Sequence, residues 1–425
     1  MKVYFDTVGC RLNQSEIEKI ASQFRAAGHE VVDTQAEADL VLVNTCAVTA
    51  EAASDSRQKI RQASRAEVSE IVVTGCWATL DPQGAADLPG VTRVVPNLEK
   101  DHIVREVLRI STEAFDLEPL ERHPLPGIRQ RTRAFIKVQD GCDNHCTFCI
   151  TRVARGAGRS QAVQQILEDI QSAVNGGAKE IVLTGVHMGS WGQDFNQPAH
   201  LMDLIKIILE ESNIPRLRLS SLEPWDLPEG FFDLWKNPRL CRHLHLPLQS
   251  GCGRTLRRMA RKTTPETYAG IVSRAREVQP EMAITTYLIV GFPGETDTDF
   301  EESLEFVREM RFAAGHVFTF SARPGTPAAR YPDQVHPTVR KERSARMRSV
   351  TAASALQYQS GFLGKTAEVL WESASGLGPN GWQMEGLTDT YIRVRAFSAD
   401  NIWNQVNTVV LEEQLDSGFL GIIQR

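Results

Sequence analysis

Residues 133–150 read RAFIKVQDGCDNHCTFCI, an apolar segment typical of a strand followed by a loop with Cys142, Cys146 and Cys149. Cysteine thiolates hold iron–sulfur clusters of the cubane type, which contain four irons. Three ligands leave one iron open, just as a catalytic zinc site keeps one position free. A zinc site would need a fourth ligand, and His145 inside the loop is poorly spaced for that role. The stretch therefore predicts a reactive cluster at the end of a strand, held by what we call the loop cysteines: Cys142, Cys146 and Cys149.

Five further apolar segments follow this strand, and helical stretches separate them. The segments are EIVLTG (180–185), RLRLSS (216–221), HLHLPLQSG (243–251), AITTYLIVG (283–291) and HVFTFSA (316–322). Six strand–helix units predict an open, partial (βα)6 barrel over residues 134–359. Active sites of such barrels lie at the carboxyl ends of the strands, where the loop cysteines also lie.

Residues 1–110 also alternate between short apolar strands and helical stretches, which predicts a doubly wound parallel sheet and an α/β fold. Three of these strands end in a cysteine, and we call Cys10, Cys46 and Cys76 the strand-end cysteines. Ligands bind at the carboxyl ends of strands in such sheets, so the three thiols are expected to converge on a shared metal site. The alternative is three buried cysteines of an ordinary core.

The rest of the chain divides by composition. Residues 111–133 contain three prolines without clear periodicity and are interpreted as a linker. Residues 360–425 hold short strands separated by turns, which predicts a small β-barrel. In it Trp371, Trp382 and Tyr391 would either stack on RNA bases or pack in the core.

Overall composition excludes some classes of protein. No run of 18 apolar residues exists, which argues against a transmembrane helix. The first residues are typical of a strand and not of a signal peptide, and eight cysteines in so long a chain favour metal ligands over a disulfide framework; both point to the cytoplasm. A net charge of −6 gives no general indication of nucleic-acid binding.

The indication of RNA binding is local. Arg254, Arg257, Arg258 and Arg261 lie at positions i, i+3, i+4 and i+7, which predicts one basic helical face without an acidic neighbour. Four more basic residues lie in or beside the linker: Arg129, Arg131, Arg133 and Lys137. Such clusters on an acidic chain favour a phosphate track, although a basic face is often only solvated.

The C-x3-C-x2-C loop after the first barrel strand resembles the radical S-adenosylmethionine superfamily. TVGCRLNQSE (7–16), VNTCAVT (43–49) and VVTGC (72–76) resemble the N-terminal domain of its methylthiotransferases. The later motifs HLPLQSG (245–251), IVGFPGET (289–296) and SARPGTPAA (321–329) are similar to that family as well. GCRLNQ and GCDNHCTFC look most like the branch that acts on N6-threonylcarbamoyladenosine in tRNA. Two segments depart from the family pattern and affect the shape of the pocket: TRV after Cys149, and Tyr287 before IVGFPGE.

The resemblance implies an enzyme with two [4Fe-4S] clusters. One, on the loop cysteines, would bind S-adenosylmethionine and cleave it to a radical that takes the C2 hydrogen of the adenine. The other, on the strand-end cysteines, would carry the sulfur, and a second S-adenosylmethionine would supply the methyl group. Seven strand-end residues are expected to line the cofactor pocket: Thr184, Gly185, Ser221, Glu223, Gln249, Ile289 and Gly291.

The resemblance also implies partners. These are tRNA, held partly by a C-terminal TRAM domain, and a low-potential electron donor of the flavodoxin or ferredoxin type. No membrane partner is expected, and the chain is expected to be a monomer.

Three alternatives remain open at this point. Relatives of the same family act on isopentenyladenosine in tRNA or on an aspartate of a ribosomal protein, although their first cysteine motifs look more like GCQMN and GCPKN. The third alternative is a non-catalytic iron–sulfur protein that binds RNA or carries electrons. An electron carrier has no need of an open iron, which argues against it.

Overall fold

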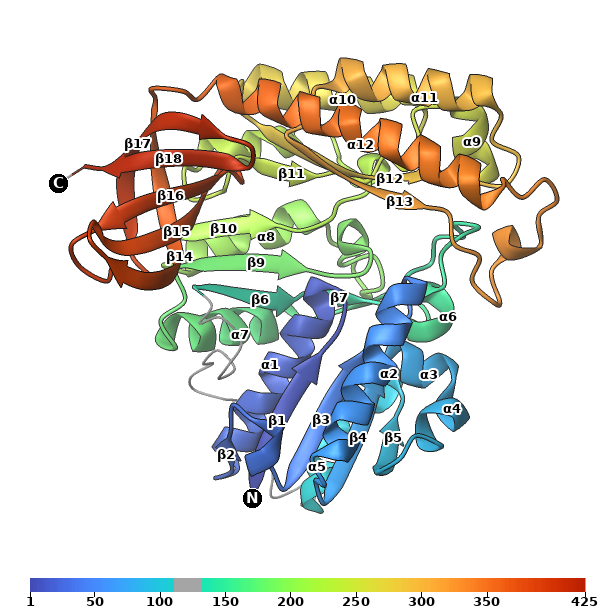
Figure 1. Ribbon diagram of the computed structural model, residues 1–425, viewed down its shortest axis with the longest axis vertical. Coiled ribbons are helices and arrows are strands. Elements are labelled where there is room, and N and C mark those ends of the chain that lie inside the picture. The colour runs from blue at the N-terminus through green and yellow to red at the C-terminus, as the bar shows by residue number, and fades with distance from the viewer. Residues whose placement is uncertain (111–131, 425) are drawn as a thin grey trace. The chain divides into compact units, whose positions relative to one another are not determined.

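The computed structural model describes residues 1–110 and 132–424 (Figure 1). The predicted linker, with Arg129 and Arg131, lies almost wholly outside the described residues. The chain forms two compact units, which we describe separately. The first comprises Met1–Asn144, Cys149–Ala199 and Glu210–Asn213, and the second comprises His145–Phe148, His200–Leu209 and Ile214–Arg425.

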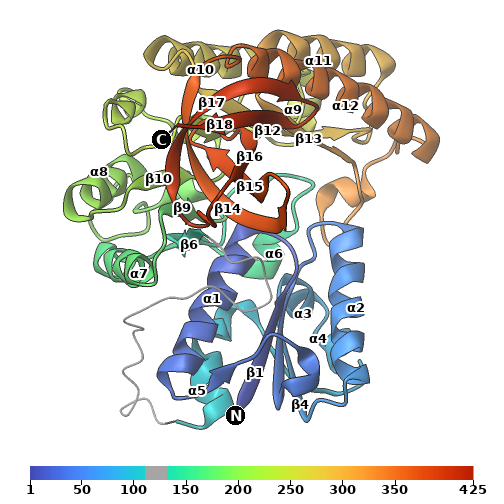
Figure 2. The same cartoon turned by 60° about the vertical axis from the view of Figure 1, so that its left-hand side comes forward.

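The first unit contains the predicted parallel sheet, with the strand order β2-β1-β3-β4-β5. Its strands are β1 (Lys2–Thr7), β2 (Glu30–Val31), β3 (Leu40–Thr45), β4 (Glu70–Gly75) and β5 (Val91–Val95). Its helices are α1 (Arg11–Ala26), η1 (Gln35–Glu37), α2 (Ala50–Arg65), α3 (Cys76–Leu80), α4 (Pro82–Ala86), η2 (Asn97–His102) and α5 (Ile103–Leu108). Figure 2 shows α1 and α5 on one side of the sheet and α2, α3 and α4 on the other.

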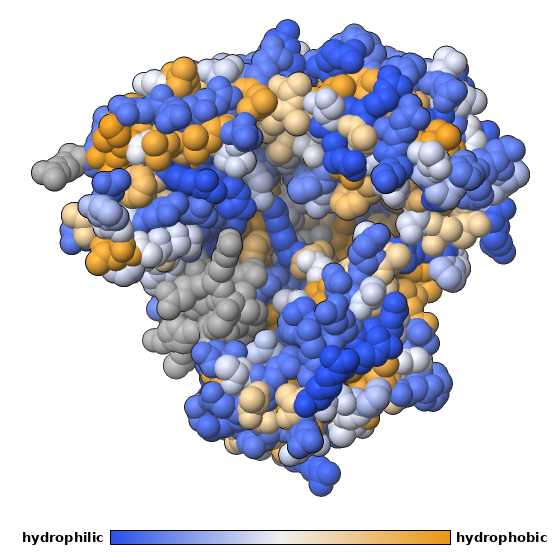
Figure 3. Space-filling model, in the orientation of Figure 1, coloured by the Kyte–Doolittle hydropathy of each residue, from blue (hydrophilic) through white to orange (hydrophobic). Residues whose placement is uncertain are grey.

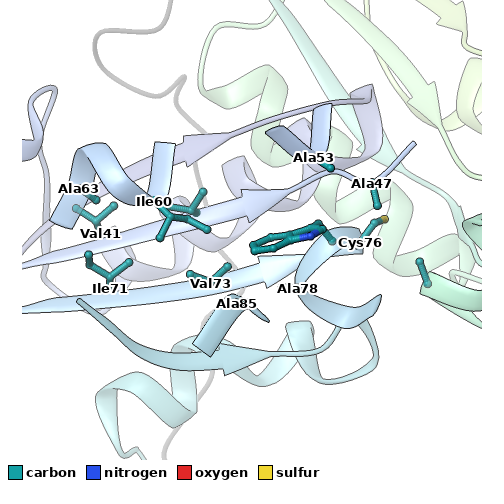
Figure 4. Packing of buried hydrophobic residues seen from close by; sticks show 13 residues of the cluster. Val41, Ala47, Ala53, Ile60, Ala63, Ile71, Val73, Cys76, Ala78 and Ala85 are labelled. Atoms are coloured by element: carbon teal, nitrogen blue, oxygen red, sulfur yellow. The ribbon is translucent and has the colours of Figure 1, made fainter. Parts of the chain in front are cut away.

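Alternation along the strands explains why helices cover both faces. Leu40 and Leu42 of β3 point into a core with α1, while Val41 and Val43 point into a second core with α2. Because successive side chains of a strand face opposite ways, a strand that is apolar throughout must be covered twice. Figure 4 shows the second core, with Cys76 at the end where the strands finish.

The first unit continues into two of the six predicted barrel strands, β6 (Arg133–Lys137) and β9 (Glu180–Thr184), which pair in parallel. Between and after them lie β7 (Gln139–Asp140), α6 (Thr151–Arg155), β8 (Arg159–Ser160), α7 (Val163–Asn175) and η4 (Met188–Ser190). The short strands β7 and β8 pair antiparallel.

The second unit holds the other four predicted strands. They are β10 (Arg216–Leu219), β11 (His243–His245), β12 (Ala283–Val290) and β13 (Ala314–Thr319). The pairs β11–β12 and β12–β13 are parallel. The helices of this part are α8 (Leu201–Glu211), which begins in the unit, and η5 (Pro224–Asp226), η6 (Phe231–Lys236), α9 (Gly253–Arg258), α10 (Pro265–Val278), α11 (Asp297–Met310), η7 (Pro327–Arg330) and α12 (Pro337–Ser360). All six predicted strands are therefore present.

The C-terminal part forms the predicted small barrel, closed in the order β14-β15-β16-β18-β17. Its strands are β14 (Thr366–Gly378), β15 (Gly381–Thr388), β16 (Arg393–Ser398), β17 (Val406–Leu415) and β18 (Gly418–Ile423). Trp371, Met384 and Phe419 are fully buried in its core. Of the two roles open to Trp371, the structure shows core packing.

Among the described residues, no helix is both long and apolar enough to span a membrane.

Candidate active site

The strand-end cysteines gather at the carboxyl edge of the parallel sheet, as predicted. Cys10 follows β1 as the N-cap of α1, Cys46 follows β3, and Cys76 is the first residue of α3 after β4. The strands β1, β3 and β4 are neighbours. Parallel neighbours end at the same edge, so cysteines distant in sequence meet there.

Glycine allows the strand ends to approach closely. Gly9 has φ +102°, and a Cβ built on it would lie 2.5 Å from the Sγ of Cys46. A side chain at this position would therefore displace the thiol and strain the backbone.

Asn13, in the first turn of α1, ties this edge together. Its Nδ2 donates to the carbonyls of Val8 (2.8 Å) and Thr45 (3.0 Å), at the ends of β1 and β3. Its Oδ1 lies 3.8 Å from the Sγ of Cys10. Cys76 has a similar neighbour, because the Nδ2 of Asn97 lies 3.6 Å from its Sγ.

The thiols also interact electrostatically. Burial raises the pKa of the Cys46 thiol to about 11, and the charges of Cys10 and Cys76 add to this shift. Although solvent reaches Cys10, the protein around its sulfur raises the thiol pKa, and the charge of Arg155 opposes the shift. Binding of a metal would therefore have to displace protons from these thiols.

The loop that carries the loop cysteines has no regular structure and is fixed at its first end by backbone contacts of the first unit. The amide of Cys142 donates to the carbonyl of Gly156 (3.1 Å), and the amide of Asn144 donates to the Sγ of Cys142 (3.4 Å). Asn144 also contacts both ring nitrogens of His187 at 3.3 Å, in the loop after β9. Sequence reasoning did not single out Asn144 or His187.

Contacts within the second unit fix the middle of the same loop. Thr147 donates from its amide to the carbonyl of Met259 (3.1 Å) and from its Oγ1 to the carbonyl of Arg258 (2.9 Å). Its own carbonyl accepts from the amide of Ala328 (2.9 Å). Phe148 packs against the apolar cluster that contains Met259 and Phe292.

Arg261 forms an ion pair with the partly exposed carboxylate of Glu223. Its side chain is 1% exposed and donates to Glu223 at 2.6 and 3.1 Å. It also lies 4.4 Å from the ring centre of Trp225, and its Nη1 lies 3.8 Å from the Sγ of Cys146. Burial opposes the charge of Arg261, but Glu223 outweighs burial and raises the pKa of the guanidinium.

These contacts correct the predicted basic face. The helix α9 ends at Arg258, and Ala260 has φ +54°, so the chain turns and Arg261 points into the protein instead of continuing the face. The expectation of no acidic neighbour was also wrong, because Arg254 pairs with Asp299 (2.5 Å) and Glu302 (3.2 Å) of α11. Arg257 and Arg258 are exposed.

The predicted cofactor residues lie where their strands end. Thr184 ends β9, and Gly185 lies so close to Gln139 that an added Cβ would be 3.1 Å from its carbonyl oxygen. In the second unit, the backbones of Ser221 and His245 form an isolated parallel β-bridge, and those of Gln249 and Leu288 form another. Gln249 has φ +72° and accepts at its carbonyl from the amide of Ile289 (2.8 Å).

Gly291 and Glu223 complete this set. The amide of Gly291 donates to Glu295 Oε1 (2.8 Å), and Glu295 is paired in turn with Arg343. Glu223 makes the ion pair with Arg261 described above. Each of these residues is thus held by contacts to its neighbours.

Aromatic side chains of the C-terminal barrel differ in exposure. Tyr391 stacks on His243 with ring centres 4.4 Å apart, and Trp382 packs against the barrel core. Phe397 on β16 is 49% exposed, and sequence reasoning missed it. Figure 3 shows hydrophobic patches on the visible face of the barrel. Exposed apolar side chains of the barrel as a whole include Leu377, Phe397 and Ile422.

Comparisons with known proteins agree with this architecture. Residues 2–95 match the model of "Uncharacterized protein family UPF0004", and residues 136–307 match the radical SAM superfamily. In structure the chain is similar to the radical S-adenosylmethionine methyltransferase TsrM from Kitasatospora setae. The TM-score is 0.60 at 16% identity, over 77% of this chain and 75% of that one, which shows the fold alone. Fold and cysteine pattern together define a radical S-adenosylmethionine protein with an added N-terminal sheet.

Curated relatives narrow this class. The chain is 35% identical to threonylcarbamoyladenosine tRNA methylthiotransferase MtaB of Bacillus subtilis, over 92% of this chain and 89% of the relative. It is 38% identical to the protein of the same name from Thermotoga maritima, over 87% of this chain and 86% of the relative. It is 30% identical to a tRNA-2-methylthio-N(6)-dimethylallyladenosine synthase of Ehrlichia canis, over 99% of both chains. The chain belongs to the radical S-adenosylmethionine methylthiotransferase family of the MtaB type.

Proposed function

We propose that this protein replaces the C2 hydrogen of N6-threonylcarbamoyladenosine, next to the anticodon of tRNA, with a methylthio group. Near full-length similarity to relatives named for this activity carries the proposal. Two separate sets of three cysteines, one in each of the two matched domains, support it.

The strand-end cysteines suit a cubane cluster. They offer three thiols from three adjacent strand ends, and Gly9 leaves the space beside Cys46 without a side chain. We therefore assign these residues to an auxiliary [4Fe-4S] cluster and the loop cysteines to a second one.

When bound at the loop cysteines, a cluster with S-adenosylmethionine supplies a radical able to take hydrogen from an unactivated C–H bond. The residues of this chain hold and orient the reacting groups. Asn144 and Thr147 fix the loop on either side of Cys146. Glu223, paired with Arg261, offers its remaining lone pairs from a fixed position.

The seven predicted strand-end residues would bind the cofactor, as the sequence indicates: Thr184, Gly185, Ser221, Glu223, Gln249, Ile289 and Gly291. Those whose side chains are engaged elsewhere would contribute backbone groups. Gly291 has no side chain and can offer only backbone groups; it has φ +70°, and a Cβ there would lie 2.2 Å from Arg340. A side chain at this position would therefore displace Arg340 and strain the backbone.

For tRNA we propose contacts from Arg257, Arg258 and the C-terminal barrel. Both arginines are exposed, and Arg258 also donates from its Nη1 to the carbonyls of Pro293 and Gly294. Their remaining donors can bind phosphates, and Phe397 offers an exposed aromatic face for a base. The protein would act as a monomer in the cytoplasm, where tRNA is found, and would take electrons from a donor of the flavodoxin or ferredoxin type.

Nucleoside analysis of tRNA from a deletion strain tests the proposal. We expect 2-methylthio-N6-threonylcarbamoyladenosine to disappear and to return with the parent gene, but not with Cys142→Ala. The methylthiolated isopentenyladenosine should be unaffected. Loss of that nucleoside instead would assign the chain to the activity named in the Ehrlichia canis relative.

A further inference from the structure

A buried group of five charged side chains lies behind the strand-end cysteines, in the first unit. We call it the buried charge cluster: Glu16, Lys100, Lys137, Asp140 and Arg155. Their side chains are between 1% and 14% exposed. The exposed side chains of Asp101 and Arg159 contact its rim.

Arg155 is the centre of this cluster. Its Nη1 donates to Glu16 (2.8 Å) and to Asp140 (2.9 Å), and its Nη2 donates to Asn13 Oδ1 (2.7 Å). Lys100 donates to Glu16 at 2.7 Å, and Lys137 lies 3.7 Å from it. Every member is therefore tied to Glu16 directly or through Arg155.

Two asparagines connect this cluster to the thiols. Asn13 accepts from Arg155 and lies 3.8 Å from the Sγ of Cys10. Asn97 donates to the carbonyl of Ala154 (2.8 Å), next to Arg155, and lies 3.6 Å from the Sγ of Cys76. The Oδ1 of Asn97 is buried and has no hydrogen-bond partner.

The charges in the cluster do not cancel. Three cations, Lys100, Lys137 and Arg155, face two carboxylates, Glu16 and Asp140, and the rim residues Asp101 and Arg159 cancel each other. Burying a net charge is costly unless an opposite charge comes close. One positive charge is therefore left without a counter-ion in the described part of the chain.

The pKa shifts of Glu16 and Arg155 favour the charged forms that this count assumes. Burial opposes ionisation of Glu16, but Arg155, Lys100 and Lys137 hold its pKa well below the ordinary value. Burial likewise opposes the charge of Arg155, but Glu16, Cys76 and Asp140 raise the pKa of its guanidinium. Burial lowers the pKa of Lys100, and Glu16 counteracts that shift.

The iron–sulfur cluster assigned to the strand-end cysteines would supply the negative charge that the buried charge cluster lacks. A cubane cluster whose core carries two positive charges, held by three thiolates, has one net negative charge. We propose that the single excess positive charge of the buried charge cluster compensates the auxiliary iron–sulfur cluster and sets its reduction potential. The inference rests on the proposed function, because it requires iron at the strand-end cysteines.

Variants that change the net charge test this inference. All are made in a background with the loop cysteines changed to Ala, so that only the auxiliary cluster contributes. Arg155→Met lowers the net charge of the buried charge cluster from +1 to zero, and Glu16→Gln raises it to +2. The double variant Glu16→Gln with Arg155→Met has a net charge of +1, as in the parent. Arg155→Lys keeps the charge but changes the hydrogen bonds. Lys19→Met is a matched control on α1, because Lys19 pairs with Asp169 outside the cluster.

The readout is the ratio of reduced to oxidised cluster at fixed potentials, followed by electron paramagnetic resonance. We expect this ratio to fall at least tenfold in Arg155→Met, a shift of about 59 mV for one electron. It should rise in Glu16→Gln. The double variant, Arg155→Lys and the control should stay within about threefold of the background.

Three results separate the possible failures. Equal ratios in all variants would overturn the inference. If Arg155→Met loses its iron, the double variant, which restores the net charge, must retain iron in the presence of a chelator. Loss of iron in both variants would mean that the hydrogen bonds of the guanidinium matter instead of the net charge. That result would also overturn the inference. If changing the strand-end cysteines to Ala in this background leaves the iron in place, the proposed cluster assignment itself fails.

Discussion

At the residue scale, charge pairing decides which basic side chains can meet a phosphate. Arg261 is enclosed by Glu223 and Trp225, whereas Arg257 and Arg258 remain exposed. Breaking a buried ion pair leaves an uncompensated charge, while an exposed arginine can be removed at little structural cost. Between positions 257 and 261, arginine therefore serves both as an exposed cation and as a buried ion-pair partner.

Salt dependence of tRNA binding distinguishes these roles. Changing Arg257 and Arg258 to Ala should weaken binding and reduce the slope of log affinity against log salt by about one unit for each phosphate that is no longer bound. Arg261→Met should leave that slope unchanged but lower the free energy of unfolding by about 3 kcal/mol, because Glu223 loses its partner. An unchanged slope in the double Ala variant would show that the RNA lies elsewhere.

At the element scale, local sequence signals explain the helices near the site. The helix α11 begins with a capping box: Thr296 accepts from the amide of Asp299 (3.1 Å), and Asp299 accepts from the amide of Thr296 (2.9 Å). The error at α9 has an equally local cause. The arginine spacing predicted a continuous helix, but Ala260 takes a left-handed conformation and ends it.

The capping box gives a prediction for stability. Thr296→Ala should lower the free energy of unfolding of the apo-protein by about 1 kcal/mol in urea titrations, because the first turn of α11 loses an acceptor. Thr267→Ala is the control, because Thr267 lies in the first turn of α10 but is not its N-cap. A comparable decrease in the free energy of unfolding in this variant would show that the loss of the cap is not responsible.

Asp299 adds a dependence on pH. Although burial raises its pKa, the Thr296 amide and Arg254 outweigh this and hold the pKa at about 2. Because this is below the value of about 3.9 in an unfolded chain, the contribution is complete above that pH and disappears as the pH falls towards 2. In urea titrations the difference between parent and Asp299→Asn should therefore shrink on acidification. A difference that grows instead would contradict the assignment.

The position of each cysteine at the end of a strand was predictable, because the cysteines and the apolar segments before them are visible in the sequence. Parallel strands share one carboxyl edge, so the convergence of the strand-end cysteines followed from the strand pattern alone. Arg155 and Asn97 could not be found in this way. Arg155 is 142 residues from its partner Asn13, and Asn97 is 57 residues from Ala154, so only the folded chain reveals these contacts.

At the scale of the whole molecule, the C-terminal barrel is built into the second unit. Arg218 is fully buried and donates to the carbonyls of Asp389 (2.9 Å) and Thr388 (3.0 Å). Arg242 pairs with Asp389 at 2.6 Å. Deleting the barrel would remove the Asp389 and Thr388 acceptors of Arg218 and one of the two ion-pair partners of Arg242, so point variants are the better test of its role.

Removing the Arg218 hydrogen bonds should destabilise the protein. Arg218→Met removes a donor from the Asp389 carbonyl and another from the Thr388 carbonyl, which keeps the Tyr391 amide. It should lower the free energy of unfolding by about 2 kcal/mol in urea titrations. Arg395→Met is the matched control, because Arg395 pairs with Glu385 at the barrel surface and should cost at most about 1 kcal/mol. Equal effects of the two variants would mean that the barrel is not anchored through Arg218.

The central claim is that the two cysteine sets do different work within one reaction. The most direct test changes all three strand-end cysteines to Ala and measures 5′-deoxyadenosine and methylthiolated nucleoside in the same assay, with reductant, S-adenosylmethionine and tRNA. We expect 5′-deoxyadenosine to form, because the loop cysteines are intact, and no methylthiolated product to appear. Methylthiolated product at the parent level would contradict the account, because the strand-end site would then have no part in supplying sulfur.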